Sequence, residues 1–111
     1  MANEMEYVPK AGDFCLFAKT DGSGKKQKPQ LVLILTPEHH NTTTGYTGVF
    51  LVDESGATQD CHISYSGKWT VHTEKLYSIS KQHYSCFDYK QSAPPKLLDL
   101  CRNEILFLLL P

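Results

Sequence analysis

The sequence predicts a small, mainly β protein of the α+β class, built as an antiparallel barrel or curved sheet with a C-terminal helix. Short apolar runs recur about every ten residues with glycine- or proline-containing turns between them, which is typical of antiparallel strands. The leucines are distributed differently, because seven of the thirteen lie in the last fifteen residues. A chain of 111 residues can form one hydrophobic core, so we expect a single domain over residues 1–111.

Four segments are predicted as strands from their apolar residues and the turn residues around them. They cover residues 12–19, 30–36, 49–53 and 68–72. Residues 54–56 are predicted to form the turn of a hairpin leading into residues 57–64. Residues 74–80 are compatible with a strand or a short helical turn, and residues 83–89 with an edge strand or an ordered loop. The polar stretch after Pro37 is expected to be a connecting loop.

The C-terminal segment is predicted to be a helix that covers the sheet. Pro94 and Pro95 can open a helix, and the residues that follow repeat at helical spacing over about residues 94–106. The apolar stripe consists of Leu97, Leu98, Cys101 and Ile105. The β body, about residues 10–92, needs such a cover because residues 31–35 are apolar on both faces of the pleat. The alternative is that this stripe docks on a second copy of the chain, as in a homodimer, or on another protein.

Composition disfavours several classes of function. Eleven Lys and Arg against twelve Asp and Glu give a formal charge of -1, so no global field attracts nucleic acid or a membrane surface. Arg102 is the only arginine beside ten lysines, and phosphoryl transfer usually relies on the bidentate guanidinium group. A hydrophobic share of 41% favours a folded domain over a disordered one.

The chain ends and the cysteines predict a cytoplasmic protein without a membrane segment. The first ten residues lack the basic and apolar regions of a signal peptide, and residues 105–110 are too few to span a bilayer. The four cysteines are expected to be reduced thiols because no secretion signal accompanies them.

The order of GDFCLF, a polar glycine-containing loop and KPQLVLILTP resembles the opening of the MazF/PemK-type toxins, which are small SH3-like barrels that cleave RNA. The resemblance covers about residues 12–37, and other SH3-like barrels, of the Tudor-like and KOW types, begin similarly. It implies that Lys28 lies where the family usually has a catalytic arginine, although lysine lacks the two-pronged donor geometry. The family's Thr or Ser after the next strand has no clear match, because Asp53 and Glu54 precede Ser55.

A lysine-rich loop and three aromatic residues are the candidate binding residues. Lys25, Lys26 and Lys28 belong to one loop that can contact phosphates, or that can simply be solvated. Aromatic side chains on strands can stack nucleobases or anchor a partner protein, but they also serve as core residues. The three aromatic candidates are Tyr46, Tyr65 and Trp69.

No catalytic residue, metal site or cofactor is predicted. The histidines and cysteines are scattered, and only His83 and Cys86 have the spacing of a ligand pair. Asp53 and Glu54 are interpreted as ordinary turn residues. No nucleophile elbow, glycine-rich phosphate loop or HExxH motif is present.

These observations favour a non-catalytic module that recognises a partner protein through its sheet surface. The alternative is a nucleic-acid-binding barrel, or a degenerate MazF/PemK-like endoribonuclease, that uses the Lys25–Lys28 loop on RNA or DNA. Cleavage of added RNA would favour the alternative, and recovery of one stoichiometric protein in a pull-down would favour the first interpretation.

Overall fold

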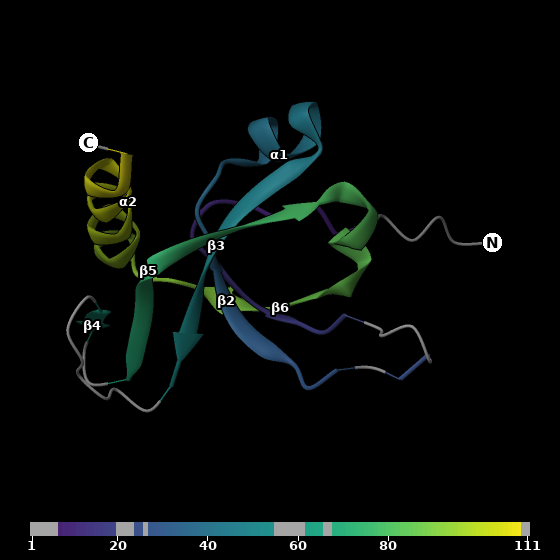
Figure 1. The fold of residues 1–111 in the computed structure, drawn as a ribbon, viewed down its shortest axis with the longest axis horizontal. Coiled ribbons are helices and arrows are strands. Elements are labelled where there is room, and N and C mark those ends of the chain that lie inside the picture. The colour runs from purple at the N-terminus through teal and green to yellow at the C-terminus, as the bar shows by residue number, and fades with distance from the viewer. Residues whose placement is uncertain (1–6, 20–23, 26, 55–61, 66–67, 110–111) are drawn as a thin grey trace.

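The protein forms one antiparallel sheet with a C-terminal helix, as predicted, in a computed structural model that describes residues 7–19, 24–25, 27–54, 62–65 and 68–109, without the side chains of 62, 64 and 106–109 (Figure 1). The described strands lie in the order β4-β5-β3-β2-β1-β6. Their bounds are β1 Asp13–Phe17, β2 Gln30–Ile34, β3 Tyr46–Asp53, β4 His62–Tyr65, β5 Trp69–Ser80 and β6 Phe87–Ser92. The other elements are α1 Glu38–Thr44, the 3₁₀ segment η1 Lys81–Cys86 and α2 Pro95–Leu109.

The strand β5 is longer than the sequence indicated. Residues 68–72 and 74–80 were predicted as separate segments, but they form the single strand Trp69–Ser80. Its pairing with β3 is interrupted, because Val49 pairs with Tyr77 and Leu51 pairs with His72. Four residues of β5 therefore oppose Phe50 alone, and such a bulge bends a strand and redirects its side chains.

The segment after Pro37 is the helix α1 and not the predicted loop. Its three threonines are weak helix formers, so the sequence of this segment does not indicate a helix. The buried Asn41 anchors it, since its side-chain Nδ2 donates to the carbonyl oxygens of Pro9 at 2.7 Å and Thr36 at 2.8 Å. Gly45 ends the helix in the left-handed conformation with φ of 76°.

The two faces of the sheet are covered by different elements. On one face Phe14, Leu33 and Phe50 pack with Leu97 and Cys101 of α2, which confirms the predicted cover by the helix. Leu98 and Ile105 flank this contact. Figure 1 shows α2 beside β5 and β4, with η1 on the opposite side of the molecule.

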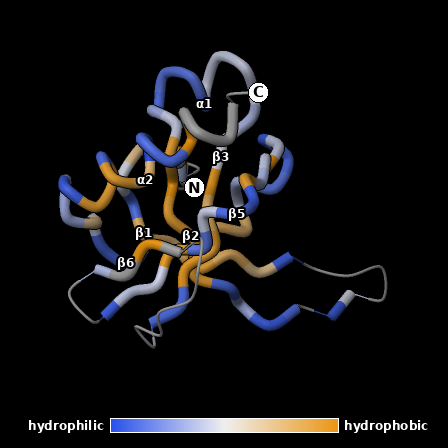
Figure 2. The backbone as a smooth tube through the Cα atoms, turned by 60° about the vertical axis from the view of Figure 1, so that its left-hand side comes forward, coloured by the Kyte–Doolittle hydropathy of each residue, from blue (hydrophilic) through white to orange (hydrophobic). Residues whose placement is uncertain are grey.

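The second face carries a smaller apolar cluster. Val32, Ile34 and Val49 pack there against Tyr84 of η1 and against Tyr7, which precedes β1. The sequence predicted neither η1 nor Tyr7 as a cover of this face. Figure 2 shows the hydrophobic residues concentrated on the central strands that both clusters share. The cover by η1 and Tyr7 is incomplete, because Leu51 and Tyr77 of the same face are only partly buried and line a cavity.

The described cysteines Cys15, Cys86 and Cys101 form no disulfide, and Cys61 lies outside the described residues. Burial raises the pKa of Cys15 to about 11 and the pKa of Cys101 to about 12. Burial and a hydrogen bond to Asp13 likewise raise the pKa of Tyr7, whose hydroxyl donates to Asp13 Oδ2 at 2.6 Å. These groups are therefore neutral in the folded protein at pH 7.

Alkaline pH is expected to destabilise the protein. The unfolded chain releases the two thiol protons near their ordinary pKa of 9.0, below the folded values, so stability is lost as pH rises from about 9 toward 12. Each thiol contributes a slope of up to about 1.4 kcal/mol per pH unit in the free energy of unfolding. Urea denaturation at pH 7.5 and 10.5 under reducing conditions measures this loss. A Cys101→Ala variant should show a shallower decline, and equal slopes for the two proteins would contradict the assignment.

Candidate functional site

The open end of the second sheet face contains a cavity of about 270 Å³. Three neighbouring strands, β2, β3 and β5, contribute its lining. The lining residues are Gln30, Leu51, Asp53, His72, Glu74, Lys75 and Tyr77. Polar and charged side chains dominate this set, in contrast to the apolar cluster that continues the same face toward η1.

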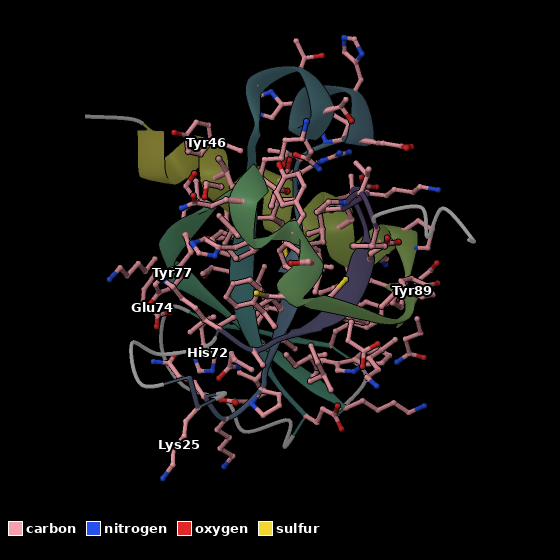
Figure 3. The ribbon with its side chains drawn as sticks, turned by 90° about the vertical axis from the view of Figure 1, so that its right-hand side faces the viewer. Lys25, Tyr46, His72, Glu74, Tyr77 and Tyr89 are labelled. Atoms are coloured by element: carbon pink, nitrogen blue, oxygen red, sulfur yellow. The ribbon has the colours of Figure 1, made fainter. Side chains whose placement is uncertain are left out.

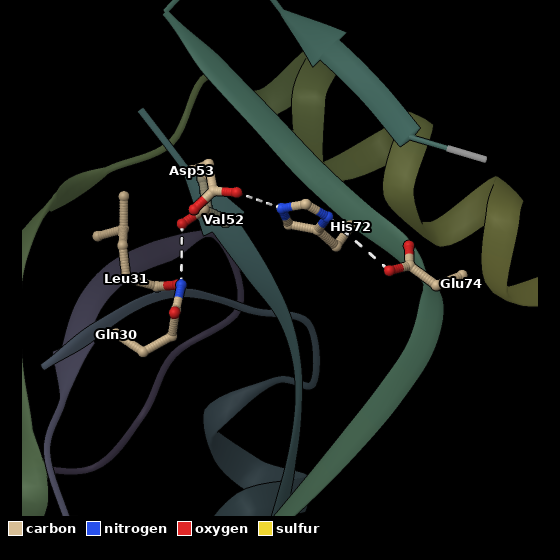
Figure 4. Close-up of polar contacts among 6 residues, drawn as sticks. All are labelled: Gln30, Leu31, Val52, Asp53, His72 and Glu74. Atoms are coloured by element: carbon tan, nitrogen blue, oxygen red, sulfur yellow. Dashed lines mark hydrogen bonds and ion pairs between the residues drawn. The ribbon is translucent and has the colours of Figure 1, made fainter. Parts of the chain in front are cut away.

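The register of β3 and β5 brings an imidazole and a carboxylate together. Leu51 pairs with His72, and Asp53 pairs with Thr70, so Asp53 and His72 are diagonal neighbours on the same face. His72 Nε2 lies 2.5 Å from Asp53 Oδ2 (Figure 4). The His72 side chain is 24% exposed and that of Asp53 is 55% exposed, so solvent and ligands can reach the pair. A carboxylate that holds an imidazole in one orientation is a recurring component of acid–base catalysis.

A second carboxylate approaches the other nitrogen of the ring. Glu74 Oε1 lies 3.8 Å from His72 Nδ1, which is beyond hydrogen-bond distance (Figure 4). The two carboxylates therefore lie at opposite nitrogens of the imidazole and do not converge on one point. Within the described part of the chain, no group of three or more His, Cys, Asp or Glu residues can hold a metal ion.

Gln30 forms the wall of the cavity on β2. Its Nε2 donates to the carbonyl oxygens of Leu31 at 3.0 Å and Val52 at 3.1 Å (Figure 4). The second of these bonds ties β2 to β3 beside Asp53 and fixes the side-chain amide at the edge of the site. The bulge in β5 forms the opposite wall, because it carries Glu74 and Lys75 between the paired residues His72 and Tyr77.

The described lysines of the predicted binding loop are Lys25 and Lys28. Lys25 is exposed and lies at the same end of the molecule as His72 in Figure 3. Lys28 lines a separate cavity of about 710 Å³ together with Pro29, Cys86 and Phe87. Lys26 lies outside the described residues. The structure thus places the described lysines around the start of β2, and their contact with phosphate stays a prediction.

The three predicted aromatic residues do not share one surface. Tyr65 and Trp69 are paired residues of β4 and β5, and both pack against the core under α2. The Trp69 ring centroid is 5.0 Å from that of Phe14. Tyr46 begins β3 far from this pair and is 55% exposed (Figure 3). Their role in binding stays a prediction, and none of them lines the cavity that contains His72.

His72 and Tyr77 are candidate functional residues that the sequence did not single out. The histidine was one of several scattered histidines, and Asp53 was interpreted as a turn residue, whereas Asp53 is the last residue of β3 and contacts His72. The only signal in the sequence was that Asp53 and His72 each lie at the end of an apolar strand segment. His83 and Cys86 both lie in η1, and their predicted lack of a metal stays untested.

The fold and the site define a protein with a curved antiparallel sheet, a C-terminal helix and a contact between a histidine and an aspartate in a cavity. Two comparisons found nothing, since no family model and no curated protein matches the chain. Solved structures of MazF proteins do match, at an identity that establishes the fold alone. None of the helices in the described part of the chain is long and apolar enough to cross a membrane.

Three of the matching structures come from Deinococcus radiodurans. Two are of the MazE-MazF complex, with TM-scores of 0.75 for form III and 0.73 for form II and 20% identity in each case. The third is MazF in form I, with a TM-score of 0.69 and 21% identity. Each match covers 93% of this chain and 96% or 97% of the other chain. The resemblance expected from residues 12–37 therefore extends over nearly the whole fold.

Proposed function

We propose that the protein is an endoribonuclease with a MazF-like fold, in which His72 is the acid–base residue and Asp53 positions it. The observation that carries this proposal is the contact of 2.5 Å between His72 Nε2 and Asp53 Oδ2 in an open cavity. It supports the alternative interpretation of the sequence better than the non-catalytic module. Asp53 ends β3 and Glu54 follows it, at the place where the family has a Thr or Ser, so the chemistry would use different residues on the same fold.

The proposed reaction is an internal transesterification of RNA. When His72 Nε2–H donates to Asp53, Nδ1 is the ring nitrogen that accepts a proton. It takes the proton of the ribose 2′-hydroxyl, whose oxygen attacks the adjacent phosphorus atom. The bond from phosphorus to the 5′-oxygen breaks, and that oxygen takes up a proton from water. His72 returns the proton it accepted to the solvent, so no proton is gained or lost overall. The products are a 2′,3′-cyclic phosphate and a 5′-hydroxyl, and no oxidant, reductant or added nucleophile is required.

Lysines supply the positive charge in this proposal. Lys75 lines the cavity, and Lys25 lies at the same end of the molecule. An ammonium group neutralises a phosphate oxygen, although it does not grip two oxygens as arginine does. These contacts offset the repulsion between the RNA backbone and the carboxylates of Asp53 and Glu74.

We also infer a protein partner. Two of the matching structures contain MazF together with MazE, and the predicted partner protein is consistent with such a complex. The apolar stripe of α2 is used within the chain, so a homodimer would have to use other residues, such as the exposed Leu100.

The proposed function is tested by incubating the protein with a labelled single-stranded RNA. A second oligonucleotide of the same sequence contains only deoxyribose. Cleavage of the RNA is expected, and the DNA is expected to remain intact because it lacks the attacking 2′-hydroxyl. Intact RNA after prolonged incubation with stoichiometric protein would overturn the proposal.

A further inference from the structure

We infer that Tyr77 is the stacking surface for the nucleobase next to the cleaved phosphate, and that Lys75 covers this ring until RNA binds. The inference rests on the proposed function, because it assigns the substrate contact of the same cavity. Tyr77 is half-buried, packs beside Val49 at the margin of the second apolar cluster, and lines the cavity with His72.

The strand pairing sets the distance between the ring and the acid–base pair. Tyr77 pairs with Val49 and His72 pairs with Leu51, so the two side chains are separated by two positions of β3 on one face. Two strand positions span about 6.6 Å. One nucleotide can therefore place its base against Tyr77 and its 2′-hydroxyl near His72. Without the bulge that separates them along β5, the two side chains could not occupy these positions.

The size and lining of the cavity favour a single base. Its volume of about 270 Å³ is smaller than the pockets of about 300–1,000 Å³ that hold drug-sized ligands. Leu51 and Tyr77 provide apolar walls, and the amide of Gln30 lies at the edge. An aromatic ring stacks any base through its π face, and this contact contributes to single-strand binding.

Lys75 occupies the ring in the absence of RNA. Its Nζ lies 4.8 Å from the centroid of the Tyr77 ring, which is a cation–π contact. A base and an ammonium group cannot cover the same π face, so the base must displace Lys75. The released ammonium group then pairs with the backbone phosphate, and the cation–π contact is exchanged for an ion pair at the moment of binding.

Binding of an oligonucleotide with a 2′-deoxyribose at the cleaved position tests this assignment, measured by fluorescence anisotropy. Tyr77→Leu is expected to raise Kd about 5- to 150-fold, because a stacked base is lost, whereas Tyr77→Phe should stay within about twofold. The two variants are compared by thermal melting to establish that both fold. Lys75→Gln should lower the slope of log K against log salt concentration by about 0.7, the value for one phosphate contact on a single strand.

An oligonucleotide with one abasic position keeps the inference testable even if Tyr77→Leu fails to fold. For the wild-type protein, removal of the base at one position should weaken binding as much as Tyr77→Leu does, and for the variant it should have no further effect. Equal binding of intact and abasic oligonucleotides at every position would overturn the inference. If RNA is cleaved but Tyr77→Leu binds like Tyr77→Phe, the assignment of Tyr77 as the stacking surface is wrong and the proposed ribonuclease function is supported. If these binding differences appear but RNA is not cleaved, the proposed ribonuclease function is wrong and the assignment of Tyr77 as a base-binding residue is supported.

Discussion

Replacing His72 by alanine is expected to lower kcat/KM for cleavage of single-stranded RNA by about 10²- to 10⁴-fold, the usual contribution of a positioned acid–base group. The side chain is only partly buried, so its removal should leave the fold intact. The substitution removes the group that accepts the 2′-hydroxyl proton, while the lysines and Tyr77 remain. RNA binding should therefore change little, and the loss should appear in kcat. Single-turnover kinetics with labelled RNA separate the two quantities.

Two further variants show whether the loss of cleavage is specific to His72 and its contact with Asp53. Asp53→Asn retains the shape of the pair but replaces the acceptor by an amide, and an intermediate loss is expected because the ring is no longer held in one tautomer. His39→Ala is the matched control, because His39 is an exposed histidine on α1. Retention of cleavage within threefold by His72→Ala, equal to the effect of His39→Ala, would exclude His72 from the chemistry.

Removal of the chain after Ala93 is expected to leave an insoluble or molten protein. Leu97 and Cys101 are both 0% exposed, and they cover Phe14, Leu33 and Phe50 on one face of the sheet. Burying a large apolar side chain contributes about 1.5–3 kcal/mol, so loss of the helix removes a large share of a stability that is typically about 5–15 kcal/mol. The truncated chain should bind a hydrophobic dye and lose its near-ultraviolet circular dichroism.

Single substitutions in α2 test the contribution of this helix to stability in a protein that still folds. Leu97→Ala is expected to lower the free energy of unfolding by about 2–5 kcal/mol, as for other fully buried leucines. Leu100→Ala serves as the control, because Leu100 is 38% exposed and should change stability by about 0.5 kcal/mol or less. A cooperative melt of the truncated chain within a few degrees of the full-length protein would show that the helix is dispensable.

Much of the fold could be predicted because it depends on patterns within single segments. Residues 31–35 are apolar on both faces of the strand, which required a cover, and the spacing of Leu97, Leu98 and Cys101 identified one. The cover by η1 and Tyr7 could not be predicted, since neither segment has a periodic apolar pattern. The helix α1 was missed because its stability depends on Asn41, whose hydrogen-bond partners include Pro9, 32 residues away, and Tyr84, 43 residues away.

The candidate site could not be predicted because it depends on pairing between strands. Asp53 and His72 are separated by 19 positions in the sequence, and only the register of β3 with β5 places them in contact. The bulge opposite Phe50 is equally invisible, because no glycine or proline marks it. The lysine loop and the resemblance of residues 12–37 to MazF/PemK toxins were the parts of the alternative interpretation that local sequence could support.

In the proposed mechanism, His72, held by Asp53, cleaves RNA through the RNA's own 2′-hydroxyl. The most direct measurement identifies the new ends of a labelled RNA after incubation with the wild-type protein and with His72→Ala, prepared in parallel. We predict 2′,3′-cyclic phosphate and 5′-hydroxyl ends with the wild type and a loss of both with the variant. Ends with a 3′-hydroxyl and a 5′-phosphate, or equal amounts of product from the two proteins, would contradict the claim.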